Sequence, residues 1–348
     1  MSFSPRLHRH AIAALGVLAL LVVAEALRAG HALGADSAVI LQYHRFGEGA
    51  LPTTSVTLEQ LEVHIAWLKD GGYAVLPVPH IVAALKSGAP LPERAIGITV
   101  DDSHRSTLLE AWPRFNAAGF PLTLFIAADS IDHGQADSMS WDDLRTLAAA
   151  GVTIANHGAS HAALWRLSSD EARRDIERGA RRLQAELGST PTLFSYPLGE
   201  FDPSLEELVR ALGYEAAFGQ HSGALDASAD FFALPRFALN ETYGEPERFA
   251  LIADVLPLPV GDLTPVDPVL RDANPPALGF TVDPAIGRLD RLSCFVSHTG
   301  PVAYETLGSH RVELRFAAPF PPGRTRVNCT LPGAGGRWRW FGMQFVVP

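Results

Sequence analysis

Two histidines and two adjacent aspartates have the residue types and the spacing of a metal site. His157 and His161 lie four residues apart, and on a helical turn that spacing puts both imidazoles on one side, where they can reach one ion. Asp101 and Asp102 directly follow the apolar run 96–100. Two carboxylates at the mouth of an apolar strand are costly unless a cation or hydrogen bonds satisfy them. Adjacent residues at a strand end point in different directions, so one aspartate can bind the metal while the other stays free as a base.

A regular alternation of short apolar runs and helical patterns must position these groups. It predicts strands at residues 38–43, 73–78, 95–100, 121–127, 152–155, 192–196 and 215–218, with helices between them. Such alternation is typical of parallel βα units, and about seven of them favour an α/β fold, a distorted (β/α) barrel. A doubly wound open sheet is the alternative, but no glycine-rich phosphate loop follows the first strand.

The carboxyl ends of parallel strands lie on one face of a barrel, where barrel enzymes carry their chemistry. His44 follows the first predicted strand, the aspartates follow the third, the histidine pair follows the fifth, and the segment 196–200 follows the sixth. We therefore expect these four segments to converge on one site.

Three of these segments resemble the motifs of polysaccharide deacetylases, carbohydrate esterase family 4, also known as the NodB-homology domain. They are Thr99-Val100-Asp101-Asp102, the His157/His161 pair, and Tyr196-Pro197-Leu198-Gly199-Glu200. The resemblance covers roughly residues 38–240 and includes a later segment, Leu234-Pro235-Arg236-Phe237. Tyr43-His44 is similar to the motif that supplies the acid histidine in a subgroup acting on poly-N-acetylglucosamine.

The resemblance implies a role for each matching residue. Asp102, His157 and His161 would bind one divalent metal, Asp101 would be the catalytic base, and His44 would be the general acid. Leu198 would offer a backbone N–H to the oxyanion, and Tyr196 and Arg236 would complete the oxyanion and substrate site. Zinc fits two imidazoles and one carboxylate, and cobalt, nickel or manganese would also bind this ligand set.

The chain departs from the family pattern at several positions. Ser103 replaces the glycine after the aspartate pair, and Val100 replaces the phenylalanine before it. Ser195 stands where an arginine commonly orients the base, a task that Arg236 could take over. His104 is a rival metal ligand, but we expect it to cap a helix or to face solvent.

The function implied is metal-dependent removal of N-acetyl groups from an N-acetylglucosamine-containing polysaccharide, with an acetylated glycan as the binding partner. Two alternatives stay open: a hydrolase of another amide or ester, and an inactive or weakly active glycan-binding module of the same fold. The net charge of −10 over 348 residues argues against a nucleic-acid binder and against docking on anionic lipid.

The first 35 residues have the pattern of a signal peptide. Basic residues precede an apolar run of 14 residues, from Ala11 to Ala24, which is short of the ~20 needed to span a bilayer. We expect an exported, periplasmic or secreted protein. An uncleaved N-terminal anchor is the alternative, and the lack of a nearby cysteine argues against a lipid anchor.

The pattern changes after the barrel, which we expect to occupy residues 36–255. Seven prolines between residues 256 and 284 predict a linker. Alternating runs in residues 285–348 predict a small β-sandwich-like domain, in which Cys294 and Cys329 form a disulfide. Trp338 and Trp340 would pack against the barrel or, alternatively, stack on sugar.

Overall fold

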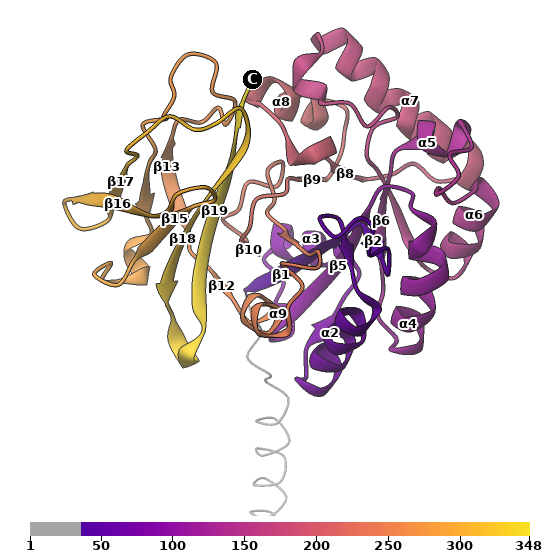
Figure 1. Ribbon diagram of the computed structural model, residues 1–348, viewed down its shortest axis with the longest axis horizontal. Coiled ribbons are helices and arrows are strands. Elements are labelled where there is room, and N and C mark those ends of the chain that lie inside the picture. Colours follow the sequence, from indigo (N-terminus) through magenta and orange to yellow (C-terminus); the bar gives the residue numbers. More distant parts are fainter. Residues whose placement is uncertain (1–35) are drawn as a thin grey trace, which may run out of the picture.

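The structure, a computed structural model, describes residues 36–348 as two packed units, a helix-covered sheet and a second, strand-rich unit (Figure 1). The predicted signal peptide or anchor lies outside the described residues. Within residues 36–348, no helix has both the length and the apolar character needed to cross a membrane.

The first unit is built on a curled sheet with strand order β10-β1-β5-β6-β7-β8-β9. Its strands are β1 (Ser37–Tyr43), β5 (Ala95–Asp101), β6 (Thr123–Ile126), β7 (Thr153–Asn156), β8 (Leu193–Ser195), β9 (Ala216–Phe218) and β10 (Ala224–Asp226). The strands from β1 to β9 along this order are parallel, and β10 is antiparallel to β1. The predicted α/β architecture is confirmed, with the sheet open between β9 and β10.

Shorter strands extend this sheet or lie beside it. β4 (Ala74–Val75) pairs with β5, and β11 (Phe237–Ala238) pairs with β1. β2 (Arg45–Phe46) and β3 (Ser55–Val56) form a separate ribbon. The predicted second strand, residues 73–78, is therefore much shorter than expected, because helix α3 already begins at Val78.

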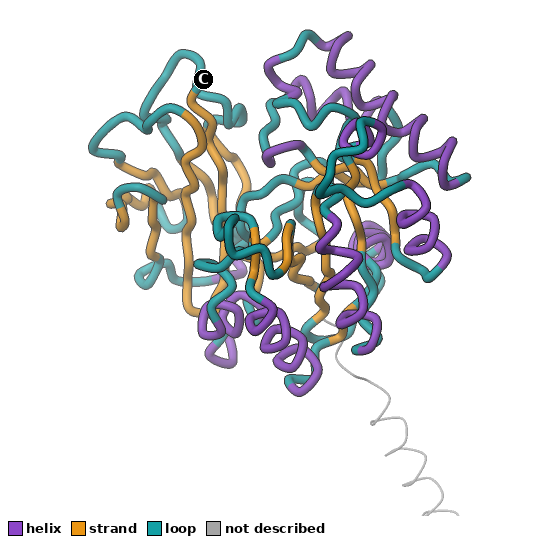
Figure 2. The backbone as a smooth tube through the Cα atoms, turned by 45° about the vertical axis from the view of Figure 1, so that its right-hand side comes forward, coloured by secondary structure: helices purple, strands orange, loops and turns teal. Residues whose placement is uncertain are grey.

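Helices cover the outer side of the curled sheet (Figure 2). They are α2 (Leu58–Asp70), α3 (Val78–Ser87), α4 (Trp112–Ala117), α5 (Ala128–Asp132), α6 (Trp141–Ala149), α7 (Ser169–Leu187), α8 (Pro203–Ala211) and α9 (Pro246–Ala253). Thr57, Ser140 and Ser168 each close a capping box, which satisfies the free N–H groups at the start of α2, α6 and α7. Every residue of β5 is buried, as expected for a parallel strand enclosed on both faces.

The second unit is an eight-stranded sheet with order β12-β19-β18-β15-β16-β17-β14-β13. Its strands are β12 (Leu256–Pro257), β13 (Val260–Thr264), β14 (Gly279–Val282), β15 (Ser293–Val296), β16 (Gly300–Leu307), β17 (Arg311–Arg315), β18 (Gly323–Pro332) and β19 (Trp338–Val347). The predicted linker 256–284 is wrong, because three of these strands lie within it. β12 and β13 are the two edges of the sheet. Of the seven prolines only Pro257 lies in a strand, the edge strand β12, where proline is tolerated.

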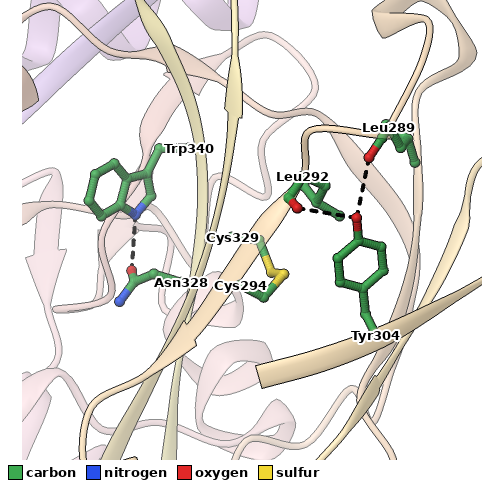
Figure 3. Close-up of a disulfide and its surroundings, with 7 residues drawn as sticks. All are labelled: Leu289, Leu292, Cys294, Tyr304, Asn328, Cys329 and Trp340. Atoms are coloured by element: carbon green, nitrogen blue, oxygen red, sulfur yellow. Dashed lines mark hydrogen bonds between the residues drawn. A yellow bond between two sulfur atoms is a disulfide. The ribbon is translucent and has the colours of Figure 1, made fainter. Parts of the chain in front are cut away.

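The predicted disulfide is confirmed: Cys294 on β15 and Cys329 on β18 are joined directly across the two strands. It closes a loop of 35 residues, which stabilises by roughly 3–4 kcal/mol on the chain-entropy model. Both cysteines belong to the core of the second sheet. Trp340 and Asn328 lie on the opposite side of these strands (Figure 3).

That opposite side packs against the first unit. Trp340 of β19 meets Phe237 of the first unit edge-on, with ring centroids 5.3 Å apart. The backbone of Ser222 rests directly on Gly342, where any side chain would collide with its carbonyl. The second sheet is therefore closely docked against the loops that follow β9.

Candidate active site

Asp102, His157 and His161 meet at the carboxyl ends of β5 and β7. Their candidate ligand atoms all lie within 4.8 Å of one another. Asp102 Oδ1 is 3.2 Å from His161 Nε2 and 3.8 Å from His157 Nε2. The structure thus brings together the three residues that the sequence suggested as a triad.

Two of the three residues hold unusual backbone conformations. Asp102 has φ 68° and His161 has φ 57°, both in the left-handed region that residues other than glycine seldom occupy. Such strain persists only where the surroundings fix it, and it clusters at functional sites. Here it turns both side chains toward the same point.

His157 is oriented by the strand beside it. Its Nδ1 lies 2.8 Å from the carbonyl oxygen of Ser195 and 2.5 Å from Ser195 Oγ. When Nδ1 carries the proton, it donates a hydrogen bond to the Ser195 carbonyl oxygen. Nε2 then keeps a lone pair, and this atom is buried with no hydrogen-bond partner. Burial lowers the pKa of His157 to about 4, so the ring is neutral near pH 7. A neutral, oriented imidazole with an unpaired nitrogen fits a metal ligand.

The loop carrying His161 is held by helix α7. Asp175 Oδ1 accepts a hydrogen bond from the backbone N–H of Ala159 at 2.8 Å, and Asp175 Oδ2 accepts one from that of Ser160 at 3.2 Å. Asp175 is buried and pairs with Arg178 at 3.1 Å. The sequence analysis missed Asp175, because one acidic residue in a charged helix gives no signal of its own.

Asp101 is bound by a buried network. Arg236 donates to both carboxylate oxygens, at 2.6 and 2.8 Å, and Gln42 donates to Oδ2 at 2.7 Å. Asp101 and Arg236 have no solvent exposure. Burial alone would raise the pKa of Asp101, but the positive charge of Arg236 outweighs it and the pKa falls below its usual value. Three hydrogen bonds leave about one of the carboxylate's four acceptor sites free.

Asp102 also stays ionised, with a different environment. Burial would raise its pKa, but the hydrogen bond from His104 and the neighbouring histidines hold the pKa well below its usual range. His104 Nε2 lies 3.2 Å from Asp102 Oδ2. The expectation that His104 caps a helix or faces solvent is therefore wrong, because its ring contacts Asp102 Oδ2.

His44 lies beside the aspartates at the end of β1. Burial lowers its pKa, and the charges of Asp101 and Asp102 oppose that effect. The preceding residue, Tyr43, is anchored by its hydroxyl group, 3.1 Å from His64 Nδ1. A contact with helix α2 thus holds the end of the strand that carries His44.

Leu198 lies in the short helical turn η3 (Pro197–Gly199) after β8, with φ 63°. Its carbonyl oxygen accepts from Arg324 and from Gln344, each at 3.2 Å, and Gln344 also donates to Gly199 at 3.1 Å. Both donors belong to the second sheet. The sequence analysis did not foresee this support, since Gln344 is 146 residues away from Leu198.

Tyr196 does not contact the site with its side chain. It is fully buried, its hydroxyl group donates to the carbonyl oxygen of Phe232 at 2.9 Å, and its ring stacks on Phe201. The expected role of this side chain in binding substrate is wrong. It packs in the core beneath the turn that carries Leu198.

Part of this chain matches a known protein family. Residues 88–217 match the model of the polysaccharide deacetylase family. This part of the chain is therefore similar to a polysaccharide deacetylase domain. The matched range includes the metal triad candidates, Asp101 and Leu198, whereas His44 and Arg236 fall outside it.

Two curated proteins are similar to this chain in sequence. YxkH of Bacillus subtilis (strain 168), named for the same family, is 24% identical over 201 residues, which cover 58% of this chain and 71% of YxkH. The poly-beta-1,6-N-acetyl-D-glucosamine N-deacetylase of Escherichia coli (strain K12) is 24% identical over 216 residues. That match covers 50% of this chain but 32% of the Escherichia coli protein.

Solved structures share the fold of the deacetylase domain. The deacetylase PplD of Streptococcus pyogenes, in complex with acetate, superposes with a TM-score of 0.58 at 20% identity, covering 62% of this chain and 98% of PplD. IcaB of Ammonifex degensii superposes with a TM-score of 0.53 at 20% identity, covering 63% of this chain and 98% of IcaB.

Proposed function

We propose that this chain is a metal-dependent hydrolase that removes N-acetyl groups from an N-acetylglucosamine-containing polysaccharide. The observation that carries the proposal is the Asp102, His157 and His161 cluster beside the buried Asp101–Arg236 pair. Family membership supports a polysaccharide deacetylase. The similarity to the Escherichia coli enzyme supports the choice of N-acetylglucosamine.

The triad fits a divalent ion, with zinc preferred by two neutral imidazoles and one carboxylate. The unpaired, buried Nε2 of His157 supports the fit, because an orphaned acceptor of that kind is costly without a partner. When bound, such an ion would polarise the amide carbonyl and lower the pKa of the attacking water.

The remaining steps belong to the side chains around the triad. Asp101, kept ionised by Arg236, accepts the proton of the attacking water. The backbone N–H of Leu198 donates to the oxyanion, in a turn fixed before the reaction begins. His44 must be protonated to donate a proton to the leaving amine, a state that the charges of Asp101 and Asp102 favour and that burial opposes. The products are acetate and a free amino sugar.

Acetate release from a panel of saccharides tests the proposal. The metal-loaded protein should release acetate from N-acetylglucosamine oligomers, and a chelator should abolish the release. Release only from O-acetylated sugars would favour an esterase, and release from none would favour a binding module. Thermal melts on the same samples would show that each protein is folded.

We also propose that the protein is exported to the periplasm or secreted. The disulfide between Cys294 and Cys329 supports an oxidising compartment. A fusion of residues 1–35 to a reporter that is active only after export tests this, and an inactive reporter would contradict it.

A further inference from the structure

A cleft lies between the two units, apart from the metal triad. It encloses about 430 Å³, within the ~300–1,000 Å³ range of ligand pockets. One wall is the barrel-facing side of β18 and β19, and the other comes from the segment 238–251, which includes most of helix α9. The residues that line it include Tyr243, Arg248, Arg326, Asn328, Trp338 and Trp340.

Two arginines lie in this cleft without a carboxylate partner. Among the described residues, neither Arg248 nor Arg326 has an acidic group within ion-pair distance, and no aspartate or glutamate lines the cleft. Arg248 donates to the carbonyl oxygen of Tyr243 at 2.6 Å, whereas Nε of Arg326 is buried with no hydrogen-bond partner. An uncompensated, partly buried guanidinium is costly, and an anion would relieve that cost.

Aromatic rings stand beside these charges. Trp338 and Tyr243 are 38% and 42% exposed, and the guanidinium of Arg248 lies over the ring of Tyr243, 4.8 Å from its centroid. Trp340 is held in place because its Nε1–H donates to Asn328 Oδ1 at 2.9 Å (Figure 3). Pre-oriented rings with an apolar face and a nearby donor suit a sugar ring, which offers C–H groups on its faces and hydroxyl groups at its edge.

The cleft adjoins the turn that carries Leu198. Gln220 lines the cleft and lies so close to Gly199 that no side chain would fit there. On β18, Arg324 supports the turn and Arg326 lines the cleft. Because residues two apart on a strand share a face, the same face of the second sheet supports the Leu198 turn and lines the cleft.

We propose that the cleft is a binding subsite for an acidic saccharide, a sugar unit that carries a carboxylate or a phosphate group. The arginines bind the anion, and the tryptophans contact the sugar ring. Binding itself does not require deacetylation, but the role of the cleft as a distant part of a longer polysaccharide site rests on the proposed function.

Isothermal titration of the purified, metal-loaded protein tests this with four probes, none of which carries an N-acetyl group: trigalacturonate, glucose 6-phosphate, neutral maltotriose and inorganic phosphate. At least one of the two acidic sugars should bind about tenfold or more tightly than maltotriose and than phosphate. The stronger of the two identifies the acidic group. Equal affinity for acidic and neutral sugars, or tighter binding of phosphate alone, would overturn the proposal.

Matched variants locate the binding. Arg326→Gln should weaken the acidic sugar about tenfold, and Trp338→Ala should weaken it severalfold. Arg291→Gln, an exposed change on the same unit, should have no effect. If Arg326→Gln does not fold, Arg326→Lys, which keeps the charge but loses the planar fork, should still weaken binding. Unchanged affinity in the folded variants would overturn the proposal. A failure to release acetate from any glycan would instead contradict the proposed function alone.

Discussion

Asp101 and Asp102 are neighbours in the chain with opposite surroundings. Asp101 is enclosed by Arg236 and Gln42 with no exposure, whereas the side chain of Asp102 is 21% exposed beside the histidines. The turn to φ 68° at Asp102 separates the two carboxylates. These different surroundings support the proposed roles, in which Asp102 binds the metal and Asp101 accepts a proton.

Replacing Asp101 by Asn should keep the metal and lower kcat by about 10²–10⁴-fold, because the base is gone while the triad remains. The change also leaves the buried charge of Arg236 unpaired, so the folded fraction must be measured alongside. The matched variant Asp102→Asn should lose the metal. Loss of metal in Asp101→Asn but not in Asp102→Asn would mean that the two roles are reversed.

Sequence reasoning found the residues whose neighbours in the chain reveal their chemistry. Asp101, Asp102, His157 and His161 stand in short motifs after apolar runs, and the structure brings them together. No such signal marks Gln42, Asp175 or Gln344. Each lies far from its partner in the sequence and meets it only in the folded structure. Tyr196 was misjudged because a motif residue can hold the core rather than the substrate.

At the scale of elements, helix α7 sets the position of the loop 158–161. Asp175→Asn should lower metal affinity by about 10–100-fold, the range typical when outer partners of ligands are lost. Asp170→Asn, an exposed change at the start of the same helix, is the control. Equal metal affinity in both folded variants, measured by competition with a chelating dye, would contradict the assigned role of Asp175.

Helix α2 is tied to the segment before α9 through a neutral histidine. His64 Nε2 lies 2.7 Å from the carbonyl oxygen of Gly244, and its ring stacks on Phe249 with centroids 3.9 Å apart. Burial lowers the pKa of His64 to about 4 from its ordinary 6.5. The unfolded chain therefore binds a proton between these values that the folded chain does not.

The stability that depends on neutral His64 should be complete above about pH 6.5 and lost as the pH falls toward 4, with a magnitude on the order of 3 kcal/mol. His64→Gln should be less stable at pH 7.5 but should show a shallower loss between pH 7 and pH 4.5. Denaturant titrations of both proteins at each pH measure this. If the free energy of unfolding fell equally with pH in both proteins, the assigned role of His64 would be contradicted.

The same scale shows why the predicted linker was wrong. Prolines usually mark breaks, and six of the seven lie outside strands, but the segments between them are long enough to form β13 and β14. Pro257 lies in β12, an edge strand that accepts proline. The buried parallel strands were easier to predict, because continuous apolar runs such as β5 leave few alternatives. Pairing of β12 with β19, more than 80 residues later, has no local signal in the sequence.

At the scale of the whole molecule, the second sheet supports the proposed active site. Gln344 and Arg324 bind the Leu198 turn from one face of that sheet, and the disulfide strengthens the core on its other face. The two units therefore share the placement of the proposed oxyanion donor.

Gln344→Ala should lower kcat about tenfold while KM and metal content stay nearly unchanged, because the turn loses two hydrogen bonds and its N–H is less well aimed. Arg315→Ala, an exposed position of the second sheet away from the barrel, is the control. A rise in KM alone, or no change in kcat, would show that the second sheet does not position the turn.

The most direct test of the account is the metal content of the folded protein. Zinc equilibrium dialysis followed by elemental analysis should give one ion per chain in the parent protein and almost none in His157→Ala or His161→Ala. Acetate release should disappear with the ion. The variant His80→Ala, at an exposed position of α3, should match the parent protein in both measurements. Full metal content with undiminished acetate release in both single variants would contradict the assignment of this triad as the reaction centre.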